Sequence, residues 1–386
     1  MSNKIIRITT SPLALKYLLP GQMKFMQKNG FDVIMISADG KERNGIIENE
    51  GCPHIVVPLT RRITPWQDLK CLWQLIKIFR KERPNIVHTH TPKAGLLGMI
   101  AAYTCSVKIR IHTVAGLPLM VEKGIKFQFL KVIEKIIYAS ANHVWPNSNS
   151  LKKYIIETNL TKRSTLEVIL NGSSNGINLN RFNKKSLNKE IIEEIKTSIV
   201  FSEKNTYLLF VGRMVADKGI TELVTAFSIL QKNQHQLKLI LVGPFEKELD
   251  PLPFDTLQEM ENNSSIHHIE WTDYVEYYMS LAHYFVFPSH REGFPNVLLQ
   301  AGAMELPIIC SNIPGNIDVV TNNETGITFE KQNEEDLINS IFCAIKSPCE
   351  SQKMASKLKE IISGQYAQEV IWQALLGKYN ELLSNR

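Results

Sequence analysis

Two segments in the second half of the chain place charged side chains directly after apolar runs. The first, YLLFVGRMVADKGI (207–220), reads as a buried strand, a turn at Gly212 and Arg213, and a helix that begins after Lys218. The guanidinium of Arg213 can present a planar set of donors to phosphate oxygens, and the ammonium of Lys218 supplies a compact positive charge. The two cations predict a site for a diphosphate, although an ordinary loop between a strand and a helix would also carry them on the surface.

The second segment, HYFVFPSHREGFPNVLLQAGAMELP (283–307), adds a carboxylate and the start of a helix. The helix is predicted from Asn296, and its first amides have no partner within the helix and carry the positive end of its dipole, which favours an anion. Glu292 can accept hydrogen bonds from sugar hydroxyls, and Gln300, about two helical turns further on, could meet a ribose. The alternative is that Glu292 only stabilises the helix start and that Gln300 is an exposed helix position.

Histidines follow two predicted strands in the first half of the chain. His88, His90 and Lys93 come after one strand, and His112 lies near the end of the next. A single histidine at a strand end is usually a hydrogen-bonded structural residue, whereas histidines at two strand ends favour a functional site. For His112, a catalytic role and a packed position with a backbone partner both stay open.

The elements that must position these side chains alternate between strand-like and helix-like segments. Near-continuous Val, Ile and Leu content indicates strands that are covered on both faces, as in parallel sheets, and the alternation predicts a doubly wound α/β fold. Ligands of such sheets bind beyond the carboxyl ends of the strands, where the candidate side chains lie. The strand-like runs are 4–10, 32–38, 54–59, 85–90, 109–114, 143–148 and 166–170, then 207–213, 237–243, 266–271, 283–289, 307–311 and 326–330.

The series runs twice, which predicts two Rossmann-like domains facing each other across a cleft. Residues 1–182 would form the first domain and residues 206–365 the second, with the charged segment 183–205 between them. The terminal helix within 366–386 could pack back on the first domain, which the sequence leaves undecided.

Composition narrows the class of protein. The chain has 386 residues, of which 44% are hydrophobic and 21% charged, and this excludes a disordered chain. Its uncharged apolar runs fall short of the roughly 18–20 residues that a membrane span needs, and its charged N-terminus does not read as a secretory signal. Six cysteines without a CxxC pair or metal-ligand spacing indicate reduced thiols, so we expect a cytoplasmic protein.

Charge is distributed unequally between the two halves. Residues 1–182 hold 26 Lys and Arg against 11 Asp and Glu, a net charge of +15, whereas residues 183–386 hold 18 against 27, a net charge of −9. The basic half should attract an anionic partner: a membrane surface, a polyphosphate or a nucleic acid. A solvated basic surface without a partner is the alternative.

Two basic segments in that half also carry apolar residues at helical spacing. They are TPWQDLKCLWQLIKIFRKERP (64–84) and KGIKFQFLKVIEKIIYAS (123–140). Such stripes usually face the core of a domain. The other interpretation is docking on the anionic inner face of the plasma membrane, where each nearby Lys or Arg contributes about 1 kcal/mol.

The GR…KG turn followed by REGFPNVLLQAGAMELP resembles the donor site of family 4 glycosyltransferases, retaining enzymes of the two-domain GT-B architecture. The resemblance extends over nearly the whole chain and includes HTHTPKAGLLGMIAA (88–102), IHTVAGLP (111–118), NGSSNGINLNRF (171–182) and SNIPGNIDVVTNNETGITFE (311–330). In style the chain is similar to bacterial enzymes that build capsule, exopolysaccharide or lipid-linked oligosaccharide.

The resemblance implies roles for individual residues. In the family, the Arg and Lys of the GR…KG turn hold the diphosphate of a sugar nucleotide, and here these are Arg213 and Lys218. The first Glu of the family motif contacts hydroxyls of the donor sugar, here Glu292, and the second binds the ribose, where this chain has Gln300. The other donor-side positions implied are Gly212, Gly243, Pro244, Thr272, Gly293, Phe294, Pro295, Asn296 and Val297.

The resemblance also implies an acceptor side. Asn171 and Ser173 lie where the family's interdomain segment faces the diphosphate, and we group them with His90 and Lys93. The family often has an imidazole, or another polar residue, after the strand that corresponds to IRIHTV, and its usual register falls on Ala115 here. Either His112 takes that place through a small shift or this chain lacks the group, and we favour His112.

The implied activity is transfer of a hexose or N-acetylhexosamine, with retention of configuration, from a nucleotide-diphosphate sugar to a lipid-linked or growing polysaccharide acceptor. We expect the nucleotide to be UDP, from its frequency in the family. The chain has no Asp-x-Asp triplet, so we expect no divalent metal and no cofactor. A nucleotide-sugar epimerase of the same architecture is the alternative, but it would need acid and base carboxylates that the segment from Glu292 to Gln300 does not offer. A nucleic-acid binder would use the basic half, yet no such motif is present, and we expect no nucleic-acid partner.

Overall fold

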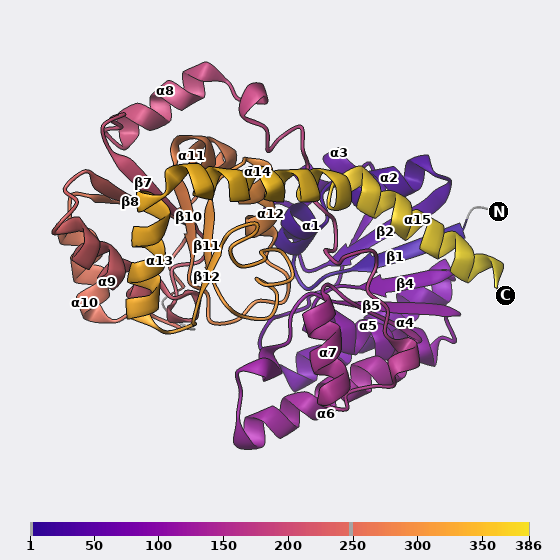
Figure 1. The fold of residues 1–386 in the computed structure, drawn as a ribbon. Coiled ribbons are helices and arrows are strands. Elements are labelled where there is room, and N and C mark those ends of the chain that lie inside the picture. Colours follow the sequence, from indigo (N-terminus) through magenta and orange to yellow (C-terminus); the bar gives the residue numbers. More distant parts are fainter. Residues whose placement is uncertain (1–2, 247–249, 386) are drawn as a thin grey trace. The chain divides into compact units, whose positions relative to one another are not determined.

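The computed structural model describes residues 3–246 and 250–385, and it divides into two compact units. The first unit contains the chain up to Asn175 and the segment from Glu369 onwards, and the second contains Gly176–Gln368. Each unit is built on its own six-stranded parallel sheet with helices on its faces (Figure 1). The predicted α/β class with two Rossmann-like domains is confirmed.

The first sheet has the strand order β3-β2-β1-β4-β5-β6, the order of a Rossmann sheet. All its pairings are parallel; Ile6, for example, stands beside Ile34 and Val87. The strands are β1 Asn3–Ile8, β2 Phe31–Ser37, β3 His54–Val56, β4 Ile86–Thr89, β5 Ile109–Val114 and β6 His143–Pro146.

The helices of the first unit begin where the sequence favours it, with proline in the first turn of several of them, since the missing amide of proline costs nothing there. They are α1 Pro12–Leu18, α2 Gln22–Lys28, α3 Arg43–Glu50, α4 Pro65–Glu82, α5 Pro92–Thr104, α6 Gly124–Ser140, α7 Asn149–Glu157 and α15 Gln368–Ser384. Helix α15 packs on this sheet through Ile371, Leu375 and Tyr379, which are buried with Ile5 and Met35.

The second sheet has the order β12-β11-β10-β7-β8-β9. Its strands are β7 Thr206–Val211, β8 Leu237–Val242, β9 Ile266–Ile269, β10 Tyr284–Phe287, β11 Ile308–Ser311 and β12 Ile327–Phe329. The helices are α8 Lys189–Ser198, α9 Ile220–Gln231, α10 Phe254–Asn262, α11 Val275–Leu281, α12 Asn296–Ala303, α13 Glu334–Lys346 and α14 Pro348–Gln365. Strand residues such as Leu208, Leu209 and Phe285 are fully buried, as expected of a sheet covered on both faces.

The structure differs from two expectations about the elements. The segment 183–205, predicted to separate the domains, belongs to the second unit, because α8 packs against α11 and buries Ile195 in the core of that unit. The run 166–170, predicted to be a strand, makes only an isolated bridge between Leu166 and Val144. Among the described residues, no helix is both long and apolar enough to cross a bilayer.

Candidate functional site

The two segments with predicted chemistry meet at the carboxyl ends of β7 and β10. These strands are neighbours, with Leu208 beside Tyr284. The turn after β7 passes so close to the end of β10 that a Cβ at Gly219 would lie 2.2 Å from the carbonyl oxygen of Pro288, and Gly219 has a φ of +70°. Only glycine fits this position, and the contact brings the two loops together.

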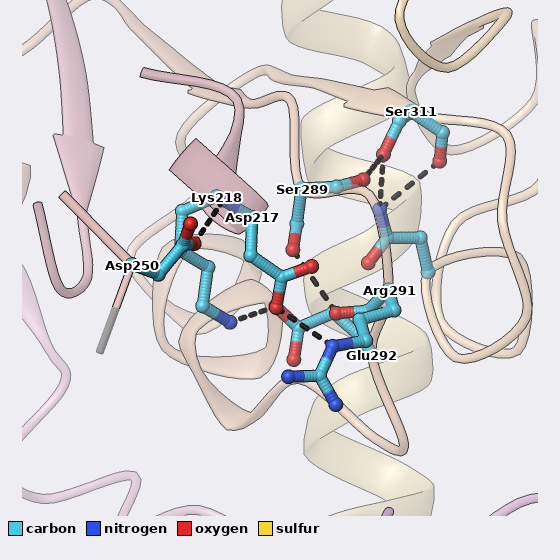
Figure 2. A network of polar contacts seen from close by, with 8 residues as sticks. Asp217, Lys218, Asp250, Ser289, Arg291, Glu292 and Ser311 are labelled. Atoms are coloured by element: carbon cyan, nitrogen blue, oxygen red, sulfur yellow. Dashed lines mark hydrogen bonds and ion pairs between the residues drawn. The ribbon is translucent and has the colours of Figure 1, made fainter. Parts of the chain in front are cut away.

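Lys218 and Glu292 form an ion pair at this junction, and Figure 2 shows their side chains pointing towards each other. The Lys218 side chain is 15% exposed and that of Glu292 is 14% exposed. The Lys218 ammonium also lies 5.6 Å from the ring centroid of Phe287. A cation and a carboxylate that the sequence separates by 74 positions therefore share one half-enclosed site.

A set of polar contacts holds the two loops in this arrangement (Figure 2). Arg291 Nε donates to Asp217 Oδ2 at 2.7 Å, and the amide of Asp217 donates to Asp250 Oδ2 at 2.7 Å. The amide of His290 donates to the carbonyl of Asp217 at 2.9 Å, and its Nε2 lies 2.8 Å from Glu222 Oε1. Burial by itself would raise the pKa of Glu222, but the hydrogen bonds from His290 and from its own backbone amide lower it below the usual value.

The loop that carries Glu292 rests on the turn after β11. A Cβ at Gly315 would lie 2.9 Å from the carbonyl oxygen of Glu292, and Gly315 has a φ of +90°. Ser311 Oγ donates to the carbonyl of Ser289 at 2.5 Å, and the buried amide of Asn316 donates to Ser311. The Glu292 backbone thus lies against Gly315, and the loop that carries it is held at Ser289 by Ser311.

Helix α12 begins directly after this loop, at Asn296, with Pro295 before it. No side chain caps its N-terminus, so its first amides point beyond the helix end as donors. Phe294 is buried with its ring centroid 5.7 Å from that of Tyr366, and Asn296, Val297 and Gln300 are partly exposed. The predicted helix start is confirmed.

Arg213 lies where a second pair of loops meets at the same edge of the sheet. A Cβ at Gly243 would lie 1.8 Å from the carbonyl oxygen of Gly212, and the amide of Met214 donates to the carbonyl of Pro244. These contacts join the loops after β7 and β8, and Arg213 Nη1 there donates to Glu246 Oε2 at 2.5 Å. Sequence reasoning missed Glu246, because nothing in the run after β8 distinguishes it from other surface carboxylates.

Thr272 lies in the loop after β9 and accepts a hydrogen bond from the amide of Tyr274 at 2.9 Å. That contact lies within its own loop. The structure therefore places Thr272 beyond the strand end, as predicted, and shows for it a role in loop conformation.

Both cations of the donor-side cluster thus have a carboxylate partner: Glu292 for Lys218 and Glu246 for Arg213. An anion with several oxygens can replace these carboxylates, because it offers the same charge-assisted hydrogen bonds and adds the helix amides. A carboxylate released in this exchange becomes an acceptor for hydroxyl groups. The geometry can therefore hold an anionic group beside a polyhydroxy group.

In the first unit the structure separates His88 from His112. His112 is 3% exposed, its Nδ1 lies 2.8 Å from Thr89 Oγ1, and a Cβ at Gly95 of α5 would lie 2.4 Å from its ring. His88 instead contacts Tyr379 of α15, on the opposite face of the sheet. Burial lowers the pKa of His112 to about 3. This is a packed histidine whose partner is a side-chain hydroxyl, which agrees with the second of the two alternatives for His112; its catalytic role stays a prediction.

A buried network that sequence reasoning missed surrounds His88. Arg7 contacts Tyr379, Gln22 and His88, and His88 Nε2 lies 2.7 Å from Thr113 Oγ1. Burial and the positive charge of Arg7 lower the pKa of His88 well below its usual value. An arginine inside the apolar run 4–10 is the one signal that could have pointed to this network.

A small cavity lies beside this network, lined by His88, His90, Trp145 and Ser173 among others. His90 stacks on His88 with ring centroids 4.4 Å apart. Within the described residues, neither ring nitrogen of His90 has a hydrogen-bond partner. Burial lowers the pKa of His90 well below its usual value, so its imidazole is neutral.

The other acceptor-side candidates occupy different positions. Lys93 contacts Asp68 of α4 and has little exposure, so it is tied to a helix packed beside α5. Asn171 lies in the loop that contributes Ile169 and Ser173 to the lining of that cavity. Within this loop the amide of Gly172 donates to the carbonyl of Ile169. The structure therefore brings His90 and Ser173 to one cavity but does not bring Lys93 there.

Comparison with known proteins supports one family over the whole chain. The family model described as glycosyl transferases group 1 matches residues 191–361, and the glycosyl transferase 4-like domain matches residues 21–172. The capsular polysaccharide biosynthesis glycosyltransferase CapM of Staphylococcus aureus is 36% identical over 384 residues, covering 99% of this chain and 98% of CapM.

The chain belongs to the family 4-type glycosyltransferases. A second relative of this glycosyltransferase, the Escherichia coli UDP-Gal:alpha-D-GlcNAc-diphosphoundecaprenol alpha-1,3-galactosyltransferase, is 26% identical and covers 83% of the chain and 81% of its own length. The crystal structure of a glycosyltransferase from Rickettsia africae superposes with a TM-score of 0.82 at 20% identity and full coverage of both chains, which places the glycosyltransferase in the GT-B fold.

Proposed function

We propose that this glycosyltransferase transfers a hexose or N-acetylhexosamine from a UDP-sugar, with retention of configuration, to a lipid-linked or growing polysaccharide acceptor in surface glycan synthesis. The observation that carries the proposal is the Lys218–Glu292 pair beside the uncapped start of α12. A sugar nucleotide needs cations for its diphosphate and acceptors for its sugar hydroxyls, and these two side chains supply one of each.

The proposed donor and acceptor also agree with the relatives. The Escherichia coli relative uses UDP-Gal and an acceptor on diphosphoundecaprenol, and the Staphylococcus aureus relative acts in capsule synthesis. We extend to this chain a uridine nucleotide, an acceptor with a lipid diphosphate, and a place on the anionic inner face of the membrane that holds such a lipid. The basic first half suits both the diphosphate and the membrane.

In the proposed mechanism the diphosphate of the donor takes over Lys218 from Glu292 and Arg213 from Glu246. The freed Glu292 carboxylate then accepts hydrogen bonds from hydroxyls of the donor sugar. As the bond between the anomeric carbon and the diphosphate breaks, negative charge grows on the leaving oxygen. Lys218, Arg213 and the first amides of α12 stabilise that charge without a metal ion.

The acceptor hydroxyl attacks the anomeric carbon on the face from which the diphosphate leaves. Its oxygen forms the new glycosidic bond, and its proton passes to the leaving phosphate oxygen, so that UDP and a glycoside with the donor's configuration result. We assign no nucleophile or general base to the protein, and His112 has no part in this scheme.

The test is ligand-induced stabilisation followed by product analysis. A ligand that binds only the folded state raises the melting temperature, so UDP-sugars should raise it, and GDP- and ADP-sugars should raise it less. With the donor that binds, proton NMR of the product should show the anomeric configuration of the donor. Turnover of the sugar nucleotide without any acceptor, or a product of inverted configuration, would contradict the proposal.

A further inference from the structure

We propose that the outward faces of α4 and α6 dock the first unit on a bilayer that contains anionic lipids. The proposal deepens the proposed function, on which it rests for the presence of a lipid-linked acceptor in that bilayer. Its support comes from how these two helices divide their apolar residues between the core and the exterior.

Helix α4 has an apolar stripe on each side. Cys71, Leu75 and Phe79 are buried in the core of the first unit. Trp66, Leu69 and Trp73 point outward instead, and Trp66 is 82% exposed. A helix that only covers a sheet needs one apolar stripe, so the second stripe, with two tryptophans, requires another explanation.

Helix α6 repeats this division. Its inner side packs through Phe127, Leu130 and Ile137 against the core of the first unit. Its outer side carries a stripe with the spacing of one helix face, and the first member is 90% exposed. The outer stripe is Ile125, Phe129, Val132 and Ile136.

The two outer stripes lie on the same side of the first sheet. Helix α5 packs against α4 and against α6, and Figure 1 shows the three helices together on one side of the strands of this unit. Stripes that point away from a common sheet face project in the same general direction. One flat apolar surface can therefore receive both.

The charged residues around the two outer stripes indicate which kind of apolar surface they would bind. The carboxylates of α4 are engaged with lysines of other elements, Asp68 with Lys93 and Glu82 with Lys4. The exposed bases of both helices remain around the apolar stripes, and the Lys77 ammonium lies 3.3 Å from the ring centroid of Trp73. These exposed bases are Lys70, Lys77, Arg80 and Lys81 on α4 and, on α6, Lys135 and Lys126, of which Lys126 pairs with Glu122 just before the helix. Tryptophan beside lysine is the composition that suits the boundary between lipid headgroups and acyl chains.

The experiment is flotation of the full chain with vesicles. Wild type should float with vesicles of phosphatidylcholine and phosphatidylglycerol at low salt, and float less with pure phosphatidylcholine or at high salt. The double variants Trp66→Glu/Trp73→Glu and Ile125→Glu/Phe129→Glu should each lower the bound fraction about tenfold or more. The matched control is Phe254→Glu, since Phe254 of α10 is 75% exposed in the second unit, and it should bind as wild type does.

A second measurement locates the contact. Brominated lipids should quench part of the tryptophan fluorescence of wild type, and the double variant Trp66→Phe/Trp73→Phe should lose that quenching while it still floats. The shift in melting temperature with a UDP-sugar should be equal in all variants, so a failure of the donor site is told apart from a failure of docking.

Three outcomes would overturn the proposal. The first is that wild type does not float with anionic vesicles, and the second is that the glutamate variants float as wild type does. The third is a concentration-dependent dimer in solution that dissociates in these variants. The last result would assign the two stripes to contact between copies of the chain.

Discussion

The two sheets both collect charged and polar side chains at the carboxyl ends of their strands, yet they hold them in different states. In the second unit Lys218 and Glu292 are an ion pair that solvent reaches. In the first unit Arg7, His88 and Tyr379 are sealed under α15. An ion pair that solvent partly reaches can exchange one partner for another anion, whereas breaking a buried polar network leaves unsatisfied groups. The second cluster therefore suits a ligand that comes and goes, and the first suits a fixed scaffold.

The sharpest test of this contrast is Lys218→Ala. Removal of one cation that stabilises a leaving diphosphate should lower turnover by about 10²–10³-fold, the effect of losing one donor to a developing negative charge. Release of UDP in the presence of acceptor measures it. Lys357→Ala is the control, because Lys357 also pairs with a carboxylate of the second unit, Glu324, but on the surface. Near-normal turnover in Lys218→Ala would refute the role of Lys218 as a support for the leaving group.

For the buried network of the first unit, we predict that Tyr379→Phe lowers stability. The variant removes one hydroxyl that contacts both Arg7 and His88 inside the first unit. The free energy of unfolding should fall by about 1–3 kcal/mol, the cost of leaving buried polar groups without a partner. Denaturant unfolding measures this, with Tyr274→Phe as the control at a half-exposed tyrosine. Equal losses in the two variants would show that the network does not stabilise the unit.

The buried histidines make the first unit sensitive to acid. The pKa of His112 is about 3 in the folded chain and about 6.5 in the unfolded chain, so the unfolded state takes up a proton first as the pH falls. Its contribution to stability is complete above pH 6.5 and is lost as the pH falls towards 3, with a slope of up to about 1.4 kcal/mol per pH unit. His112→Asn should reduce the pH dependence of the free energy of unfolding in this window.

The exposed His235 supplies the control for this measurement. His235→Asn should leave the slope between pH 6.5 and 5 as it is in wild type. His112→Asn should also leave the pH profile of kcat unchanged, since His112 is packed under α5. A changed pH profile of kcat would show that His112 takes part in catalysis.

The smallest expected effect concerns Gln300. If its side chain meets the ribose of the donor, Gln300→Glu should strengthen that hydrogen bond and lower the KM for the donor about two- to fivefold at unchanged kcat. Gln258→Glu on the exposed face of α10 is the control for the added charge. An unchanged KM would mean that Gln300 does not touch the donor.

Much of the fold and part of the site could be predicted from local patterns. Strand ends, the turn glycines and the start of α12 follow from runs of a few residues, so Lys218, Glu292 and Asn296 were located correctly at the ends of elements. The face on which His112 lies could not be predicted, because β5 is buried on both sides and its apolar content gives no alternation. The outer stripes of α4 and α6 were ambiguous for the same reason, since a stripe at helical spacing does not reveal which face meets the core.

By itself the sequence determined the alternation of strands and helices, the two sheets and the charge of each half, because these depend on neighbours along the chain. Tertiary structure alone decided that Tyr379 would contact Arg7 over a separation of 372 positions and that Lys218 would meet Glu292. It also decided that Trp66 would face outward. Such contacts depend on which strands lie side by side and which face each helix covers, and no local periodicity encodes that choice.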